Sequence, residues 1–304
     1  MKKSRYKLLM CDLDGTLIGK GHTTNEADKE ALRKARESGM MISICTGRSW
    51  RESRHLIADL QLDVPGVFSN GAELNWNITG NSIEHVPLSD RAMEVLLPLC
   101  RERSLTPIML LHQHHPDDPL YLVEDVAKLH PATTDWFRRN GVSHLISTSA
   151  DESLLKRCLR VGLIMEEPSA AEFTARLDRD YGDQFSYHQL QALHFQTAIL
   201  EIFNRGVNKW FGILQLCGHL GVDPRDVVTI GDDVNDIPML ENADLSYAMG
   251  SAPEHVRSSA KKTTLAHAQS GVAAAVADLF GSQSVPMPSD QGTARYSNLG
   301  LANE

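Results

Sequence analysis

The sequence predicts an α/β protein in which a second α/β domain is inserted into a doubly wound, Rossmann-like parallel sheet. Short apolar runs alternate with helix-forming stretches in the first and last thirds of the chain, which is typical of parallel sheets covered by helices. From residue 80 to residue 191 this alternation gives way to antiparallel-looking strands. The chain has 304 residues, which is enough for two domains.

The first part of the core is predicted over residues 1–79. A short apolar strand precedes Asp12, and the next segment carries an apolar stripe typical of a helix that ends at Gly39. The third strand ends at Asn70 and Gly71. The predicted elements after the first strand are a helix over 25–38, a strand over 40–45, a helix over 49–60 and a strand over 64–69.

The inserted domain is predicted over residues 80–191, and a unit of this size can form its own hydrophobic core. Its predicted helices cover 89–103, 134–140, 151–158 and 169–180, and its strands cover 106–111, 120–123, 142–147 and 159–165.

The core is predicted to resume over residues 192–281. We expect strands over 193–203, 226–230 and 244–248, a helix beginning near Asn208, and helices over 236–241, 253–259 and 271–280. Residues 282–304 are rich in Ser, Pro, Gly and Asn, a composition that predicts disorder.

Composition narrows the class of protein. The formal net charge of −9 opposes binding to nucleic acid or anionic lipid, so a small-molecule substrate is expected. No apolar run is long enough to cross a membrane, and no signal peptide is recognised, which predicts a cytoplasmic protein. The five cysteines are widely spaced without a C-x-x-C pair, so we expect reduced thiols buried as small hydrophobes.

The run Asp12-Leu13-Asp14-Gly15-Thr16 is the most informative motif. Alternate residues of an extended chain share a face, so Asp12 and Asp14 can converge at the strand end. Two close carboxylates repel unless a cation lies between them, and oxygen ligands favour Mg²⁺. One acid could then serve as nucleophile and the other as proton donor in phosphoryl transfer. Taken alone, the motif fits a calcium-like loop or a solvated turn equally well.

Other polar residues follow further strand ends, where ligands of doubly wound sheets bind. Asp232 could complete a metal site begun by Asp12, and Lys209 at a helix start would bring a positive charge to it. Thr46 and the Gly47 backbone could donate hydrogen bonds to phosphoryl oxygens. Phosphoryl transfer requires this combination of positioning and charge stabilisation.

Together these motifs resemble those of the haloacid dehalogenase superfamily, in particular its Cof-type branch. Only a helix and a strand fit between Leu17 and Cys45, whereas a large insertion fits between Thr46 and Lys209, similar to the family's C2 cap arrangement of the C2B type. The matching segments are Asp12-Leu13-Asp14-Gly15-Thr16, Thr46-Gly47-Arg48, Asn70-Gly71-Ala72, Gly206-Val207-Asn208-Lys209 and Gly231-Asp232-Asp233-Val234-Asn235-Asp236.

The resemblance implies a role for each matching residue. Asp12 would attack phosphorus, and Asp14 would protonate the leaving group and then activate water. Asp12, the Asp14 backbone carbonyl and Asp232 would bind Mg²⁺. The remaining implied roles are phosphoryl binding by Thr46, Gly47 and Lys209, orientation of Lys209 and of metal-bound water by Asn235 and Asp236, and contacts to the phosphate or leaving group by Asn70 and Gly71.

Several residues keep a second interpretation. Asn70-Gly71 is also a common turn pair, and Arg48 could either contact substrate or cap its helix. The segment His112-Gln113-His114-His115 could hold a soft metal ion, but without cysteine or helical spacing a solvated or substrate-facing loop is the better interpretation.

The predicted function is hydrolysis of a small phosphorylated metabolite, such as a sugar phosphate, through an aspartyl phosphate and with Mg²⁺ as cofactor. A phosphomutase would use the same nucleophile but exclude water from the phosphoenzyme. A phosphometabolite-binding protein would need no proton donor, and the presence of Asp14 argues against it.

Overall fold

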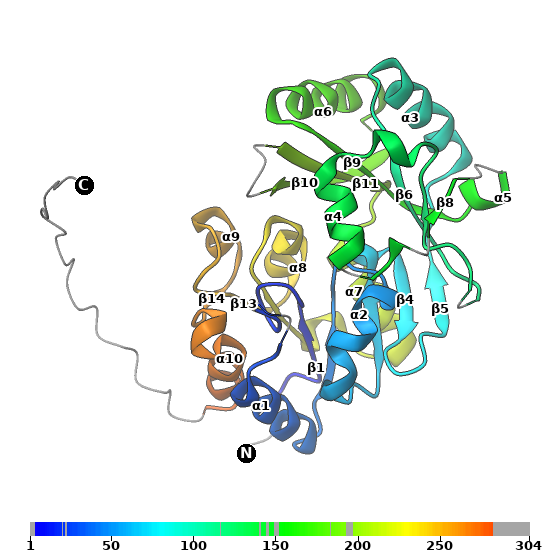
Figure 1. Ribbon diagram of the computed structural model, residues 1–304. Helices are drawn as coiled ribbons and strands as arrows, with labels where there is room; N and C mark the ends of the chain where they lie inside the picture. The colour runs from blue at the N-terminus through cyan, green and yellow to red at the C-terminus, as the bar shows by residue number, and fades with distance from the viewer. Residues whose placement is uncertain are drawn as a thin grey trace, which may run out of the picture.

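A computed structural model describes residues 4–281 except 20, 22, 116, 140, 144–145, 149–151, 183 and 193–196. Two parts are visible in Figure 1: a core that contains the start and the end of the described chain, and a cap above it formed by the middle of the chain. The predicted disordered tail over residues 282–304 lies outside the described residues.

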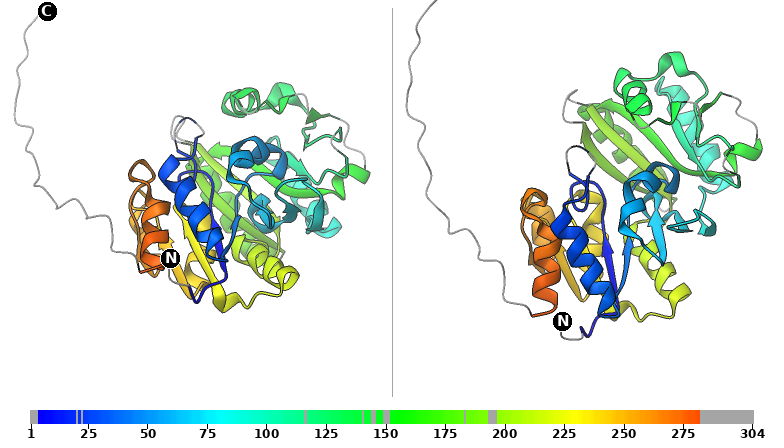
Figure 2. Two further views of the ribbon diagram at one scale, coloured as in Figure 1. Left: turned by 90° about the horizontal axis from the view of Figure 1, so that it is seen from below. Right: turned by 60° about the horizontal axis from the view of Figure 1, so that its bottom comes forward.

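The core is built on a five-stranded parallel sheet with the strand order β14-β13-β12-β1-β2. Figure 2 shows its strands side by side, with helices on either side. The strands are β1 (Leu8–Cys11), β2 (Met41–Ile44), β12 (Val227–Gly231), β13 (Leu245–Ala248) and β14 (Lys262–Thr263).

The two faces of β1 show why the sheet is covered on both sides. Leu9 and Cys11 are buried against α1 (Glu26–Glu37) and α10 (Gly271–Leu279), whereas Leu8 and Met10 are buried against α7 (Lys209–Leu220) and α8 (Ile237–Asn242). Strands buried on both faces are continuously apolar rather than alternating. The predicted doubly wound core is therefore confirmed, and α9 (Glu254–Ser259) completes its helices among the described residues.

A small antiparallel sheet extends the core beyond the predicted limit at residue 79. It contains β3 (Pro65–Phe68), β4 (Glu73–Trp76) and β5 (Ser82–His85), and a parallel bridge between Cys45 and Val67 joins β3 to the main sheet. Helix α2 (Trp50–Ile57) lies beside it and continues in a 3-10 turn over Ala58–Leu60. The β4–β5 hairpin was not predicted, because β5 is largely exposed and carries little apolar signal.

The cap is a six-stranded sheet with the strand order β10-β11-β9-β6-β7-β8, in which α3 and α6 cover the side away from the core and α4 packs against the other side (Figure 1). Its strands are β6 (Ile108–Leu111), β7 (Tyr121–Leu122), β8 (Ile146–Ser147), β9 (Cys158–Glu166), β10 (Phe185–Ala192) and β11 (Thr197–Asn204). Its helices are α3 (Asp90–Glu102), α4 (Pro131–Arg139), α5 (Glu152–Leu155) and α6 (Glu167–Tyr181).

One long strand was assigned to the wrong domain. The strand predicted over 193–203 as the return of the core is β11, which pairs antiparallel with β9 and β10 in the cap sheet. The core therefore resumes after Asn204 and not at residue 192. An apolar strand looks alike in either domain, and the polar residues of β10 concealed the partner that holds β11 in the cap.

The five cysteines are buried free thiols, as predicted. None of the described helices has the length and apolar character that crossing a membrane requires.

Candidate functional site

The candidate site forms where several core strands end side by side. Asp12 follows β1, Thr46 follows β2, Asn70 follows β3 and Asp232 follows β12. Parallel strands present their carboxyl ends at one edge of a sheet, so residues far apart in the sequence become neighbours there. This topology, and not local sequence, assembles the site.

Lys209 lies between two carboxylates at its centre. Its Nζ atom is 2.5 Å from Asp12 Oδ1 and 2.5 Å from Asp236 Oδ1. Lys209 is fully buried at the first turn of α7, and a buried charge is tolerated only when it is paired. Burial disfavours the ammonium, but Asp12 and Asp236 outweigh it and raise the pKa of Lys209. Burial raises the pKa of Asp12 well above its usual range, and Lys209 opposes that rise.

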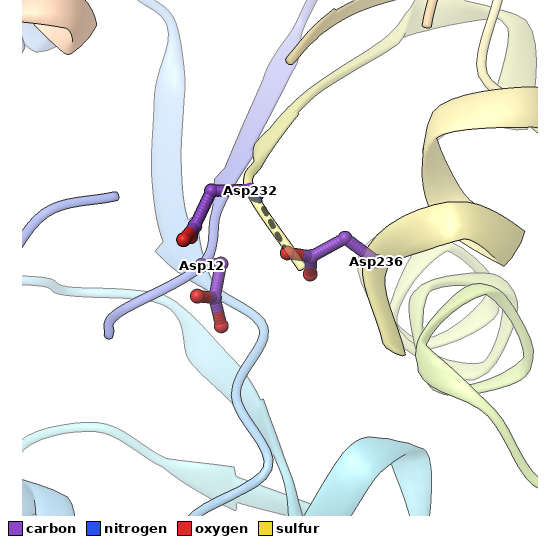
Figure 3. Close-up of side chains that lie close together, drawn as sticks. All are labelled: Asp12, Asp232 and Asp236. Atoms are coloured by element: carbon purple, nitrogen blue, oxygen red, sulfur yellow. Dashed lines mark hydrogen bonds between the residues drawn. The ribbon is translucent and has the colours of Figure 1, made fainter. Parts of the chain in front are cut away.

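Three carboxylates gather beside this ammonium. Asp12, Asp232 and Asp236 offer ligand atoms that all lie within 4.8 Å of one another. Figure 3 shows the three side chains close together. Asp232 accepts a hydrogen bond from Thr16 Oγ1 at 2.8 Å, and its backbone N–H donates to Asp236 Oδ2 at 2.8 Å. Burial and the charge of Asp236 raise the pKa of Asp232 to about 7. A divalent cation with a preference for hard oxygen ligands fits this donor set and would relieve the repulsion.

Asp236 is therefore engaged on both oxygens. Oδ1 accepts from Lys209, and Oδ2 accepts from the backbone N–H groups of Asp232 and Asp233. The contact with Lys209 agrees with the orienting role that the family resemblance implied. Asp233 caps the turn that follows β12, with its side chain directed to backbone N–H groups and not to the carboxylate cluster.

The Asp14 carboxylate lies outside the cluster. Arg48 donates two hydrogen bonds to it, from Nε to Oδ2 at 2.6 Å and from Nη2 to Oδ1 at 2.7 Å. Arg48 thus orients the Asp14 carboxylate, and its contact with substrate stays a prediction. The N-terminus of α2 is capped by Ser49 and Glu52, each satisfying a backbone N–H of the other.

The predicted phosphate-binding loop is tightly packed. The Thr46 hydroxyl accepts from the Arg48 backbone N–H at 3.2 Å, and a Cβ at Gly47 would lie 3.2 Å from Asn70 Nδ2. A Cβ at Gly71, where φ is +100°, would lie 2.1 Å from the Asn208 carbonyl. The close approach to the start of α7 accounts for Gly71 without any substrate contact.

A chain of buried and partly buried polar groups links this loop to the cap. Asn235 Nδ2 donates to Asn70 Oδ1 at 3.0 Å, and Asn70 Nδ2 donates to Glu201 Oε2 at 2.9 Å. Arg160 forms an ion pair with Glu201 and donates to the Gly47 carbonyl at 3.2 Å. Asn70, predicted to contact the phosphate or leaving group, and Asn235, predicted to orient Lys209 and metal-bound water, thus belong to the polar chain that connects core and cap.

Sequence reasoning missed Arg160, Glu201 and His188. His188 stands opposite Glu201 in the ladder between β10 and β11, so both side chains share the face turned to the core. Within the described chain His188 Nε2 is buried without a hydrogen-bond partner, and burial together with Lys209 lowers the pKa of His188 to about 4. The signal was present, since Arg160 and Glu201 are charged residues inside otherwise apolar stretches of β9 and β11, where charges rarely occur without a function or a partner.

The histidines of the segment 112–115 differ in burial. His114 and His115 are exposed, as a solvated loop requires, but His112 is buried, with Nδ1 2.7 Å from Glu73 Oε1 and its ring stacked on His85. In the described part of the chain these histidines form no group suited to a metal ion.

Comparison with known proteins shows the family. The model of haloacid dehalogenase-like hydrolases matches residues 9–276. The chain is 26% identical over 278 residues to 5-amino-6-(5-phospho-D-ribitylamino)uracil phosphatase YitU of Bacillus subtilis, covering 90% of this chain and 97% of that protein. It is also 26% identical to the chloroplastic endoribonuclease YBEY of Arabidopsis thaliana, but it spans only 46% of the length of that protein.

A solved structure supports the fold. BT1666 from Bacteroides thetaiotaomicron, described among phosphatases of the haloalkanoate enzyme superfamily, superposes with a TM-score of 0.76 at 24% identity. The match covers 93% of this chain and 98% of that one, so the cap and core occur there in the same combination.

Proposed function

The chain belongs to the haloacid dehalogenase-like hydrolase family, and on that premise we propose that it is a Mg²⁺-dependent phosphatase of small phosphorylated metabolites. The observation that carries this proposal is the buried ammonium of Lys209, held between Asp12 and Asp236 beside Asp232. A positive charge fixed next to a carboxylate nucleophile is suited to receiving a phosphoryl dianion.

Asp12 is the proposed nucleophile. Its carboxylate oxygen forms a bond to phosphorus while the bond from phosphorus to the leaving oxygen breaks, which gives an aspartyl phosphate. Lys209 orients this carboxylate and stabilises the phosphoryl oxygens, and the Thr46 hydroxyl and the Gly47 backbone N–H assist it. When bound, Mg²⁺ would neutralise charge on the phosphoryl group. Asp12 and Asp232 with the Asp14 carbonyl are its proposed ligands.

Asp14 is the proposed proton carrier. It donates a proton to the leaving alkoxide and then takes one from the water whose oxygen attacks phosphorus and releases Asp12. Arg48 fixes the orientation of this carboxylate between the two steps. Asp14 has a side chain that is 50% exposed, so water can reach it.

The polar residues of the cap favour a substrate whose leaving group carries hydroxyl groups. The face of the cap sheet turned to the core carries Arg160, His188 and Glu201, and it offers both donors and acceptors. Buried polar groups of this kind discriminate strongly in favour of substrates that pair with them. Sugar phosphates and related phosphomonoesters are therefore the proposed substrates.

The test is hydrolysis of p-nitrophenyl phosphate and of a panel of sugar and nucleoside phosphates, with Mg²⁺ and with a chelator. We expect Mg²⁺-dependent release of phosphate that Asp12→Asn abolishes. In water enriched in ¹⁸O, label should appear in the released phosphate, whereas a phosphomutase would yield a rearranged ester without it. Undiminished hydrolysis by the Asp12→Asn variant would contradict the proposal.

A further inference from the structure

A second hollow lies between the cap and the core, away from the carboxylate cluster. It has a volume of about 430 Å³ and is bounded by α2, by the β4–β5 hairpin and by the cap segment 111–115. This size is within the range of small-molecule sites. None of Asp12, Lys209 and Asp232 lines it.

The floor of the hollow presents hydrogen-bond acceptors. Asn75 is only 5% exposed, and its Oδ1 atom has no hydrogen-bond partner among the described residues. Glu73 lies beside it, 6% exposed, with Oε1 held by His112. A buried acceptor without a donor costs free energy, so a ligand hydroxyl that donates to Asn75 would be favoured.

The rim of the hollow is cationic. Arg51 and Arg54, three residues apart on α2, line it, and neither forms an ion pair or hydrogen bond with a described residue. The guanidinium carbon of Arg54 lies over the face of Trp50, 5.8 Å from the ring centroid. Burial and the charge of Arg54 lower the pKa of Arg51, and the charge of Asp117 offsets only part of this shift. An anion between the two guanidinium groups would relieve their repulsion.

The walls suit the carbon skeleton of such a ligand. Leu111 and Leu120 are buried apolar residues of the cap that line the hollow, and Trp50 of the core lines it as well. An aromatic ring beside aliphatic side chains accommodates the C–H face of a polyol.

We propose that this hollow is a second ligand site, which binds a small polyhydroxylated anion such as a sugar phosphate. The anionic group lies between Arg51 and Arg54 at the rim, and a hydroxyl donates to Asn75 on the floor. The ligand contacts residues of both the cap and the core.

The test uses the full chain with Asp12→Asn, so that the probe, glucose 6-phosphate, is not hydrolysed, and measures binding by calorimetry. We expect Arg51→Gln combined with Arg54→Gln to weaken binding at least tenfold, since both charge-assisted hydrogen bonds to the anion are lost. Asn75→Leu should weaken binding of glucose 6-phosphate but not of inorganic phosphate. The matched control, Arg138→Gln with Arg139→Gln on α4, removes the same charge from side chains that are 72% and 70% exposed and should leave binding unchanged.

A comparison with the catalytic centre makes the outcome decisive. In the same background Thr46→Val alters the predicted phosphate loop while keeping the side-chain shape, and it should leave the arginine-dependent binding intact. Binding that Thr46→Val removes and the double arginine variant retains would belong to the catalytic centre and would overturn the second site. The absence of any binding that depends on Arg51 and Arg54 would overturn it as well.

Discussion

Arg48 and Asp14 face each other in a bidentate ion pair, with Nε to Oδ2 at 2.6 Å and Nη2 to Oδ1 at 2.7 Å. Two parallel hydrogen bonds fix the plane of the carboxylate as well as its position. Asp14, as proposed, donates a proton to the leaving alkoxide and later takes one from the attacking water. A fixed carboxylate orientation favours both transfers. This pair couples the strand end at β1 to the loop after β2.

We expect Asp14→Asn to lower kcat by about 10²–10⁴ fold, the usual contribution of a general acid–base group. Arg48→Lys keeps the charge but loses the bidentate geometry, so a smaller drop in kcat with little change in KM is expected. Steady-state kinetics with p-nitrophenyl phosphate and one sugar phosphate measures both effects. Wild-type kcat in Asp14→Asn would rule out the proton-carrier role.

The buried ammonium should matter for folding as well as for turnover. Lys209→Met leaves Asp12 and Asp236 buried without their counter-charge, and we expect the free energy of unfolding to fall by about 3–5 kcal/mol. Adding Asp236→Asn removes one of the two buried carboxylates that Lys209→Met leaves unpaired. The double variant should regain part of the lost free energy of unfolding but no activity. Urea unfolding followed by circular dichroism measures both; equal stability of the single and double variants would contradict the coupling.

Gly15 allows a sensitive test of the metal site. A Cβ at Gly15, where φ is +85°, would lie 2.1 Å from Asp232 Oδ2, so Gly15→Ala must displace that carboxylate. Mg²⁺ affinity, measured through activation of hydrolysis, should fall at least tenfold. Gly39→Ala is the matched control, because Gly39 has φ +89° with open space around its Cβ and suffers only the backbone strain. Equal Mg²⁺ affinity in the two variants would mean that Asp232 is not a ligand.

The raised pKa of Asp232 predicts opposite pH effects with and without metal. Burial and Asp236 raise the pKa of Asp232 to about 7, so the metal-free fold holds its proton more tightly than the unfolded chain does. This contribution to stability is complete below about pH 4 and is lost as the pH rises toward 7. Mg²⁺ requires the carboxylate, so its stabilising effect should grow over the same range.

Thermal unfolding with a chelator and with Mg²⁺, between pH 5 and pH 8, checks this expectation. The difference in Tm between the two conditions should widen as the pH rises and should shrink in Asp232→Asn. A difference that is constant with pH would count against metal binding at Asp232.

The sequence by itself determined the core and the pieces of its centre. Apolar strands that end in polar residues mark both the parallel sheet and the edge where ligands bind, because a strand buried on two faces can expose functional groups only at its end. Asp12, Thr46 and Asp232 were found in this way, and Lys209 was found at the start of a predicted helix. Their positions follow from local pattern and from the one rule that parallel strands end together.

Only the tertiary structure decided what each side chain touches. Arg48 meets Asp14 and Glu201 meets Asn70 across long stretches of chain, and no local pattern records which partners a cap sheet will bring to a core loop. The domain of β11 was undecidable for the same reason, since its apolar residues fit either sheet and its partners β9 and β10 alone place it in the cap. Burial and pattern are local properties of a sequence, whereas contact between domains depends on the whole packed chain.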